Sequence, residues 1–72
     1  MDTIEGTLIL AQETRFQLLD RNGVGHLFIL GHHCSAEPEQ LPKLANSRIR
    51  VHFSSPSGIL AHVASRIDLL DA

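Results

Sequence analysis

Five short apolar segments of this 72-residue chain have the pattern of β-strands, and one further segment has a different spacing. In a strand, successive side chains lie on opposite faces of the sheet. The pattern predicts five strands, near residues 6–11, 15–19, 26–30, 48–53 and 59–69. Between the third and the fourth, residues 37–45 form a helical window. Pro42 lies inside this window and interrupts longer helices, so we expect one or two helical turns.

The order of these elements is strand, strand, strand, helix, strand, strand, which is the order of the OB-fold, a five-stranded Greek-key barrel. We therefore predict an all-β protein, a five-stranded OB-like Greek-key barrel with one short helix between strands 3 and 4. Residues 1–72 would form it as a single domain. Pro38 suits the first position of the helix, and Leu41 and Leu44 are expected to fill the open end of the barrel. Gly6 is expected to mark a bulge or bend in the first strand.

The clearest turn signal is Asp20-Arg21-Asn22-Gly23, because Asn-Gly between two apolar segments favours a tight hairpin. With Asn22 and Gly23 as its two central residues, the faces of the second and third strands follow. The core side then holds Phe16, Leu18, Leu27 and Ile29. The outer side holds Arg15, Gln17, Leu19, His26, Phe28 and Leu30. Gly25 leaves a longer loop open, and a shift of one residue would turn one strand over.

The last two strands carry a second group of polar residues. In the fourth strand, alternation predicts Ile49, Val51 and Phe53 on the core side and Arg48, Arg50 and His52 outside. With a turn centred on Pro56 and Ser57, His52 and His62 are expected opposite or nearly opposite each other on the outer face. Such a pair could bind a metal or act as a pH-sensitive contact. An alternative anion-binding face would comprise Arg48, Arg50, His52, His62 and Arg66.

Several motifs resemble those of cold-shock domains, which are nucleic-acid-binding members of the OB group. They are Gly6-Thr7-Leu8, Asp20-Arg21-Asn22-Gly23, Leu27-Phe28-Ile29-Leu30, Val51-His52-Phe53 and the segment from Gly58 through Val63. The resemblance implies binding of single-stranded RNA or DNA on the face of the second and third strands. The two stacking phenylalanines of the family fall on Arg15 and Gln17 here, whereas the phenylalanine of its second motif is kept as Phe28. An unrelated small barrel with an SH3-like path is the competing fold.

Our first functional hypothesis is a small non-enzymatic module that binds single-stranded nucleic acid weakly or selectively. Its site would comprise Arg15, Gln17, Arg21, His26 and Phe28. Phe28 would stack on a base, the arginines would stack or bind phosphate, and Gln17 would read base edges. The net charge of −2 argues against strong non-specific binding.

The second hypothesis is a protein-interaction or scaffold module that does not bind nucleic acid, and a homodimer is one form of it. Grouped exposed apolar side chains mark interfaces. The apolar side chains expected outside the core are Ile9, Leu19, Leu30 and Leu60. The surroundings of Phe28 distinguish the two hypotheses: arginines favour nucleic acid, and a ring of Ile9, Leu19 and Leu30 favours a protein partner.

We expect neither a metal, nor a cofactor, nor enzymatic activity. The segment His32-His33-Cys34 offers imidazole and thiolate groups, but neighbouring residues of an extended chain point apart. We interpret it as a polar loop with a partly buried Cys34. The sequence has no nucleophile-elbow motif, no phosphate-binding glycine loop and no suggestive pair of carboxylates.

The remaining features indicate a cytoplasmic protein without a membrane partner. A single cysteine, Cys34, cannot form an intrachain disulfide, which favours a reducing compartment. The start of the chain does not resemble a signal peptide. The longest uninterrupted apolar runs are Leu8–Ala11 and Leu27–Leu30, far shorter than the roughly 20 residues of a membrane helix.

Overall fold

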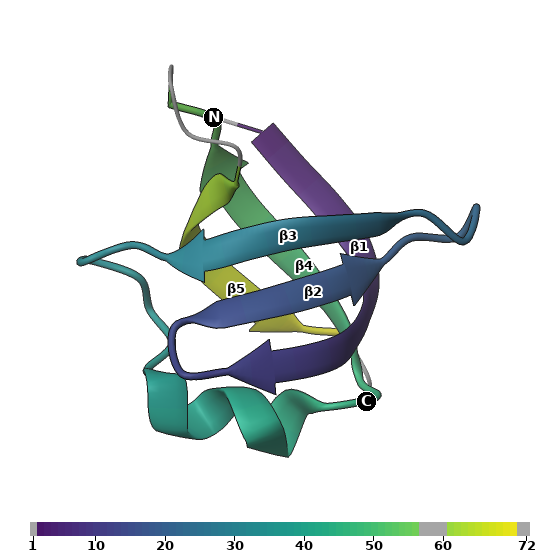
Figure 1. Ribbon diagram of the computed structural model, residues 1–72, viewed down its shortest axis with the longest axis horizontal. Helices are drawn as coiled ribbons and strands as arrows, with labels where there is room; N and C mark the ends of the chain where they lie inside the picture. The colour runs from purple at the N-terminus through teal and green to yellow at the C-terminus, as the bar shows by residue number, and fades with distance from the viewer. Residues whose placement is uncertain (1, 57–60, 71–72) are drawn as a thin grey trace.

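The structure, a computed structural model, describes residues 2–56 and 61–70. Its strands are β1 (Asp2–Gln12), β2 (Arg15–Leu19), β3 (Gly25–Leu30), β4 (Arg48–Ser54) and β5 (His62–Leu69). A 3₁₀ helix, η1 (Pro38–Leu44), lies between β3 and β4. The prediction of an all-β fold with one short helix in this place is confirmed. The strands pair in a closed ring in the order β1-β2-β3-β5-β4, and this ring is compatible with an OB-like barrel (Figure 1).

β1 holds the ring together, because its two halves pair with different strands. Residues Asp2–Thr7 pair with β4, and Thr7–Gln12 pair with β2. Gly6 lies where the halves meet: a Cβ atom added there would stand 2.5 Å from the carbonyl oxygen of Leu19. Only a residue without a side chain permits this approach of β1 to β2. The bulge itself falls three residues later, at Ile9, where the β1–β2 register shifts.

The hairpin between β2 and β3 differs from the predicted two-residue turn. The Asp20 amide donates to the Val24 carbonyl oxygen (2.9 Å), and the Gly23 amide donates to the Asp20 carbonyl oxygen (3.0 Å). The loop therefore has three residues, 21–23, with Gly23 at a φ of 81°, which glycine adopts without strain. The Asp20 carboxylate accepts hydrogen bonds from the amides of Asn22 (2.9 Å) and Val24 (3.0 Å).

This extra residue turns β3 over, so the predicted outward position of Phe28 is wrong. Phe28 lies opposite Phe16 and is completely buried. The two rings stack with centroids 5.1 Å apart, and Phe53 meets Phe28 edge-on. Leu27, predicted in the core, is instead 42% exposed. Ile29, also predicted in the core, faces the same outer side, opposite Arg15.

The core fills the interior of the ring and the end of the ring that η1 covers. The buried cluster comprises Leu8, Phe16, Leu18, Phe28, Leu41, Ile49, Val51 and Ala64. Leu41 comes from η1 and Leu44 packs beside the cluster, as predicted for a helix that closes the barrel end. Pro38 begins the helix, and Glu37 precedes it as the N-cap residue. The Gln40 side chain accepts a hydrogen bond from the Glu37 amide (2.7 Å).

We expect Gly6→Ala to lower the free energy of unfolding by about 2–3 kcal/mol, because the new methyl group overlaps the Leu19 carbonyl oxygen. Gly25→Ala is the matched control, since a Cβ atom there meets open space. It should leave stability unchanged or raise it by about 0.5 kcal/mol. Urea denaturation measures both, and equal losses in the two variants would contradict the close approach at Gly6.

A second pair of substitutions tests the register of β3. Phe28→Leu should cost about 1–2 kcal/mol because it leaves a cavity in the core. Leu27→Ala should change stability by less than about 0.5 kcal/mol, because Leu27 lies outside the core. The hairpin predicted from the sequence requires the opposite order of the two losses.

Candidate functional site

The structure divides the patch predicted for nucleic acid between the two sides of the sheet. Arg15 and Gln17 lie on the outer side of β2, two residues apart. Arg21 is exposed in the hairpin loop. His26 turns to the other side, where its Nε2 atom lies 2.8 Å from Asp20 Oδ2, and Phe28 is in the core. Only Arg15 and Gln17 thus share a surface of the kind predicted.

That surface, the outer face of β1, β2 and β3, is mainly apolar. Gln17 pairs with Leu10 of β1 on one side and with Leu27 of β3 on the other. Leu10 is 58% exposed and Leu27 is 42% exposed. We call this surface the β1–β2–β3 face, and its residues are Leu10, Gln12, Arg15, Gln17, Leu19, Leu27 and Ile29.

A shallow hollow of about 170 Å³ opens on the β1–β2–β3 face. Its walls come from Leu10, Gln12, Arg15, Phe16, Gln17 and Leu27. Arg15 is the only charged residue among them. In residues 2–56 and 61–70, Arg15 forms no ion pair or side-chain hydrogen bond. We call this depression the Gln17 hollow, and it combines apolar walls, two amide side chains and one available cation.

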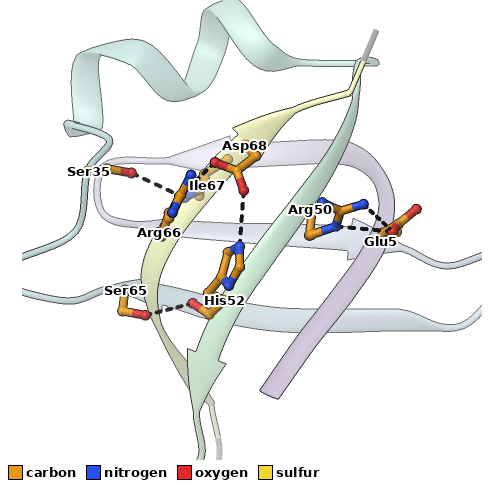
Figure 2. Close-up of polar contacts among 8 residues, drawn as sticks. All are labelled: Glu5, Ser35, Arg50, His52, Ser65, Arg66, Ile67 and Asp68. Carbon is orange, nitrogen blue, oxygen red and sulfur yellow. Dashed lines mark hydrogen bonds and ion pairs between the residues drawn. The ribbon is translucent and has the colours of Figure 1, made fainter. Parts of the chain in front are cut away.

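The opposite side of the barrel carries the alternative anion-binding face, and its cations are occupied (Figure 2). Arg50 donates from Nε (3.1 Å) and Nη2 (2.8 Å) to Glu5 of β1. Arg66 Nε donates to Asp68 Oδ1 at 2.8 Å, and Arg48 lies 3.9 Å from Glu5. An added anion would therefore compete with two carboxylates already in place.

These contacts act on the acids as well. The hydrogen bond and charge of Arg50 hold the pKa of Glu5 below its ordinary value. The hydrogen bond with His52, followed by that with Arg66, lowers the pKa of Asp68. Across the barrel, the hydrogen bond with His26 lowers the pKa of Asp20, and the amides of Val24 and Asn22 add to the effect.

His52 and His62 are not opposite each other, so the predicted pair is wrong. Ser54 pairs with Val63, so the connection between β4 and β5 is longer than the predicted turn, and the bulge between His52 and Phe53 adds one residue to the shift. His52 consequently lies opposite Arg66. The His52 Nε2 atom lies 3.0 Å from Asp68 Oδ2. His62 instead sits beside the rings of Phe28 and Phe53, with its Nδ1 atom 2.6 Å from Ser55 Oγ.

The loop after β3 lines a second cleft, of about 490 Å³. His32 and Cys34 line it together with Glu37, while Ile29, Leu30 and Pro38 form apolar walls. Cys34 is half-buried and carries a free thiol, and His33 is exposed. Within the part of the chain that the structure describes, no three His, Cys, Asp or Glu side chains are grouped to hold a metal ion.

The apolar residues predicted for a protein interface also divide. Ile9 and Leu19 are 42% and 36% exposed, whereas Leu30 packs against the core. Leu60 lies outside the described residues. Sequence reasoning missed Leu10 and Leu27, the two most exposed apolar residues of the β1–β2–β3 face. The signal in the sequence was Gly25, which left a longer hairpin loop open. A loop of three residues places Leu27 on the outer face.

Comparisons of the chain with protein-family models, with curated proteins and with solved structures gave no match. Among the described residues, no helix has the length and apolar character needed to cross a membrane. The function of this chain is therefore inferred from its geometry alone.

We expect acid to destabilise the fold partly through Asp20. Its pKa is lower in the folded chain than the ordinary value of 3.8. The resulting stabilisation is complete above that value and is lost as the pH falls through the lower folded value. Asp20→Asn keeps an oxygen that accepts from the loop amides but removes the charge. Urea denaturation between pH 6 and pH 2 should show a smaller loss of stability in this variant than in the unaltered chain.

Asp2→Asn is the control for this experiment, because Asp2 forms no ion pair in the described part of the chain. Its pH profile should follow that of the unaltered chain. If Asp20→Asn loses as much stability in acid as the unaltered chain, the lowered pKa of Asp20 is refuted.

Proposed function

We propose that this chain is a non-enzymatic binding module that binds a protein segment through the β1–β2–β3 face. The observation that carries the proposal is the row Leu10–Gln17–Leu27, in which two exposed leucines flank an open hollow. Exposed apolar side chains gathered on one face of a small domain are typical of an interaction surface. Their burial by a partner would remove both leucines from water.

The surroundings of Phe28 match neither of the two sets of neighbours considered in the sequence analysis, because Phe28 is buried among Phe16, Phe53 and His62. The consequence for function nevertheless differs between the two hypotheses. Stacking on bases supplies much of the affinity of single-strand binding sheets, about 1–3 kcal/mol per base. Phe16 and Phe28 are buried, and Phe53 packs against the core. The chain contains no Trp or Tyr. A protein partner needs no such platform, so the β1–β2–β3 face suits it better.

Relationship to cold-shock domains and residence in the cytoplasm belong to the same proposal. The OB-compatible ring order supports the relationship at the level of the fold. The single thiol of Cys34 and the absence of any possible intrachain disulfide support a reducing compartment. Neither changes the partner that the β1–β2–β3 face fits.

The test is a selection of random dodecapeptides displayed on phage against the immobilised chain, followed by NMR titration of the peptides obtained. We expect selected peptides to shift the amide signals of Leu10, Gln17 and Leu27. Leu27→Ser should weaken their binding about tenfold, because it removes an exposed apolar contact at the centre of the surface. Leu69→Ser is the matched control, since Leu69 is 56% exposed but lies at the end of β5.

Three results would overturn the proposal. The selected peptides shift signals of another surface, Leu69→Ser weakens binding as much as Leu27→Ser, or only oligothymidylate and oligouridylate shift the β1–β2–β3 face. Sedimentation at several concentrations decides whether the partner is a second copy of this chain. Self-association that Leu27→Ser abolishes assigns the face to a homodimer, which is the homomeric form of the proposal.

A further inference from the structure

The Gln17 hollow has a charge property that its apolar walls alone do not explain. Elsewhere on the sheet, arginines lie beside carboxylates: Arg50 and Arg48 beside Glu5, and Arg66 beside Asp68. Arg15 has no such partner in the described residues. Glu13, two positions earlier, forms no ion pair with it. The guanidinium group is thus available at the edge of an apolar hollow.

The spacing of Arg15 and Gln17 along β2 determines how one ligand could contact both the Gln17 hollow and the Arg15 guanidinium group. Arg15 and Gln17 are two residues apart on the same side of a strand, a separation of about 6.5–7 Å. In an extended peptide, side chains at positions i and i+2 also point to one side with this separation. One of them can enter the hollow between Leu10 and Leu27 while the other reaches Arg15.

We propose, on the basis of the function proposed above for this face, that the partner is an acidic apolar protein segment in extended form. An apolar side chain fills the Gln17 hollow, and a carboxylate two positions away forms a bidentate pair with Arg15. The amides of Gln12 and Gln17 donate to or accept from the backbone of the segment.

Charge complementarity favours this partner over a basic segment or a nucleic acid. A lysine at the position of the carboxylate would face the only charged group that lines the hollow, which has the same sign. Polyanionic nucleic acids gain affinity from several phosphate contacts, whereas the hollow provides a single cation. The net charge of −2 also means that attraction for an acidic segment arises at Arg15 and not from the molecule as a whole.

The experiment uses fluorescein-labelled decapeptides of defined sequence with the chain of residues 1–72. One contains leucine and aspartate at alternate positions separated by serine. A second has lysine in place of aspartate, and a third has serine in place of leucine. Fluorescence anisotropy measures affinity, and NMR titration locates the bound peptide. We expect the leucine–aspartate peptide to bind about tenfold more tightly than the leucine–lysine peptide, and the serine–aspartate peptide to bind more weakly than the first.

Variants at Arg15 assign this preference. Arg15→Gln should remove it, and Arg15→Glu should reverse it in favour of the lysine peptide. Arg21→Gln makes the same charge change in the hairpin loop, beyond the end of β2 that lies farthest from Arg15, and should leave the preference intact. Arg15 and Arg21 are both exposed, so the three variants should keep the NMR spectrum of the folded chain.

The possible failures are distinguishable. If aspartate and lysine peptides bind the β1–β2–β3 face equally, or if Arg15→Glu leaves the preference unchanged, the acidic partner is refuted while the binding face stands. If neither peptide binds while phage-selected peptides without acidic residues do, the same conclusion follows. If oligothymidylate binds this face more tightly than the aspartate peptide, both proposals are overturned.

Discussion

The Asp20 carboxylate determines on which side of the sheet each β3 residue lies. By accepting hydrogen bonds from the Asn22 and Val24 amides, it closes a hairpin loop of three residues. A loop with one residue fewer would exchange the two faces of β3. The aromatic contacts of Phe28 with Phe16 and Phe53 depend on this register. So does the exposure of Leu27, and hence the existence of an apolar outer surface. One polar cap thus decides both the composition of the core and the character of the surface.

The order of the elements could be predicted from the sequence, whereas the faces of β3 could not. In β4, basic and apolar residues alternate strictly, so Ile49 and Val51 could be assigned to the core without a partner strand. In β3, Leu27–Leu30 are all apolar and carry no alternation. Their assignment depends on the loop alone, and two-residue and three-residue loops with an Asn-Gly pair are both common. The burial of Leu41 was predictable because the helical window offers few apolar residues to close the barrel.

The candidate site was predictable to the same limited degree. Arg15 and Gln17 could be placed outside because β2 alternates, but Leu10 and Leu27 flank them only through the registers of β1 and β3. The prediction of a histidine pair failed for a related reason: Ser54 pairs with Val63, so the β4–β5 connection is longer than the predicted turn, and His62 lies beside Phe53. Pairing of Arg50 with Glu5, 45 positions earlier, requires the β1–β4 register and has no signal in the local sequence.

The pairing between β3 and β5 is the shortest strand pairing in the ring. It joins Phe28–Leu30 to His62–Ala64 in parallel, whereas each of the other neighbouring pairs of strands is matched over five or six residues. Fewer paired residues therefore hold β3 to β5 than hold the other neighbouring strands together. During fluctuations of the native state, we expect β3 and β5 to separate before the other strand pairs and to admit water to the aromatic cluster. Phe28, at the centre of the core, therefore lies in the pair of strands that we expect to separate most easily.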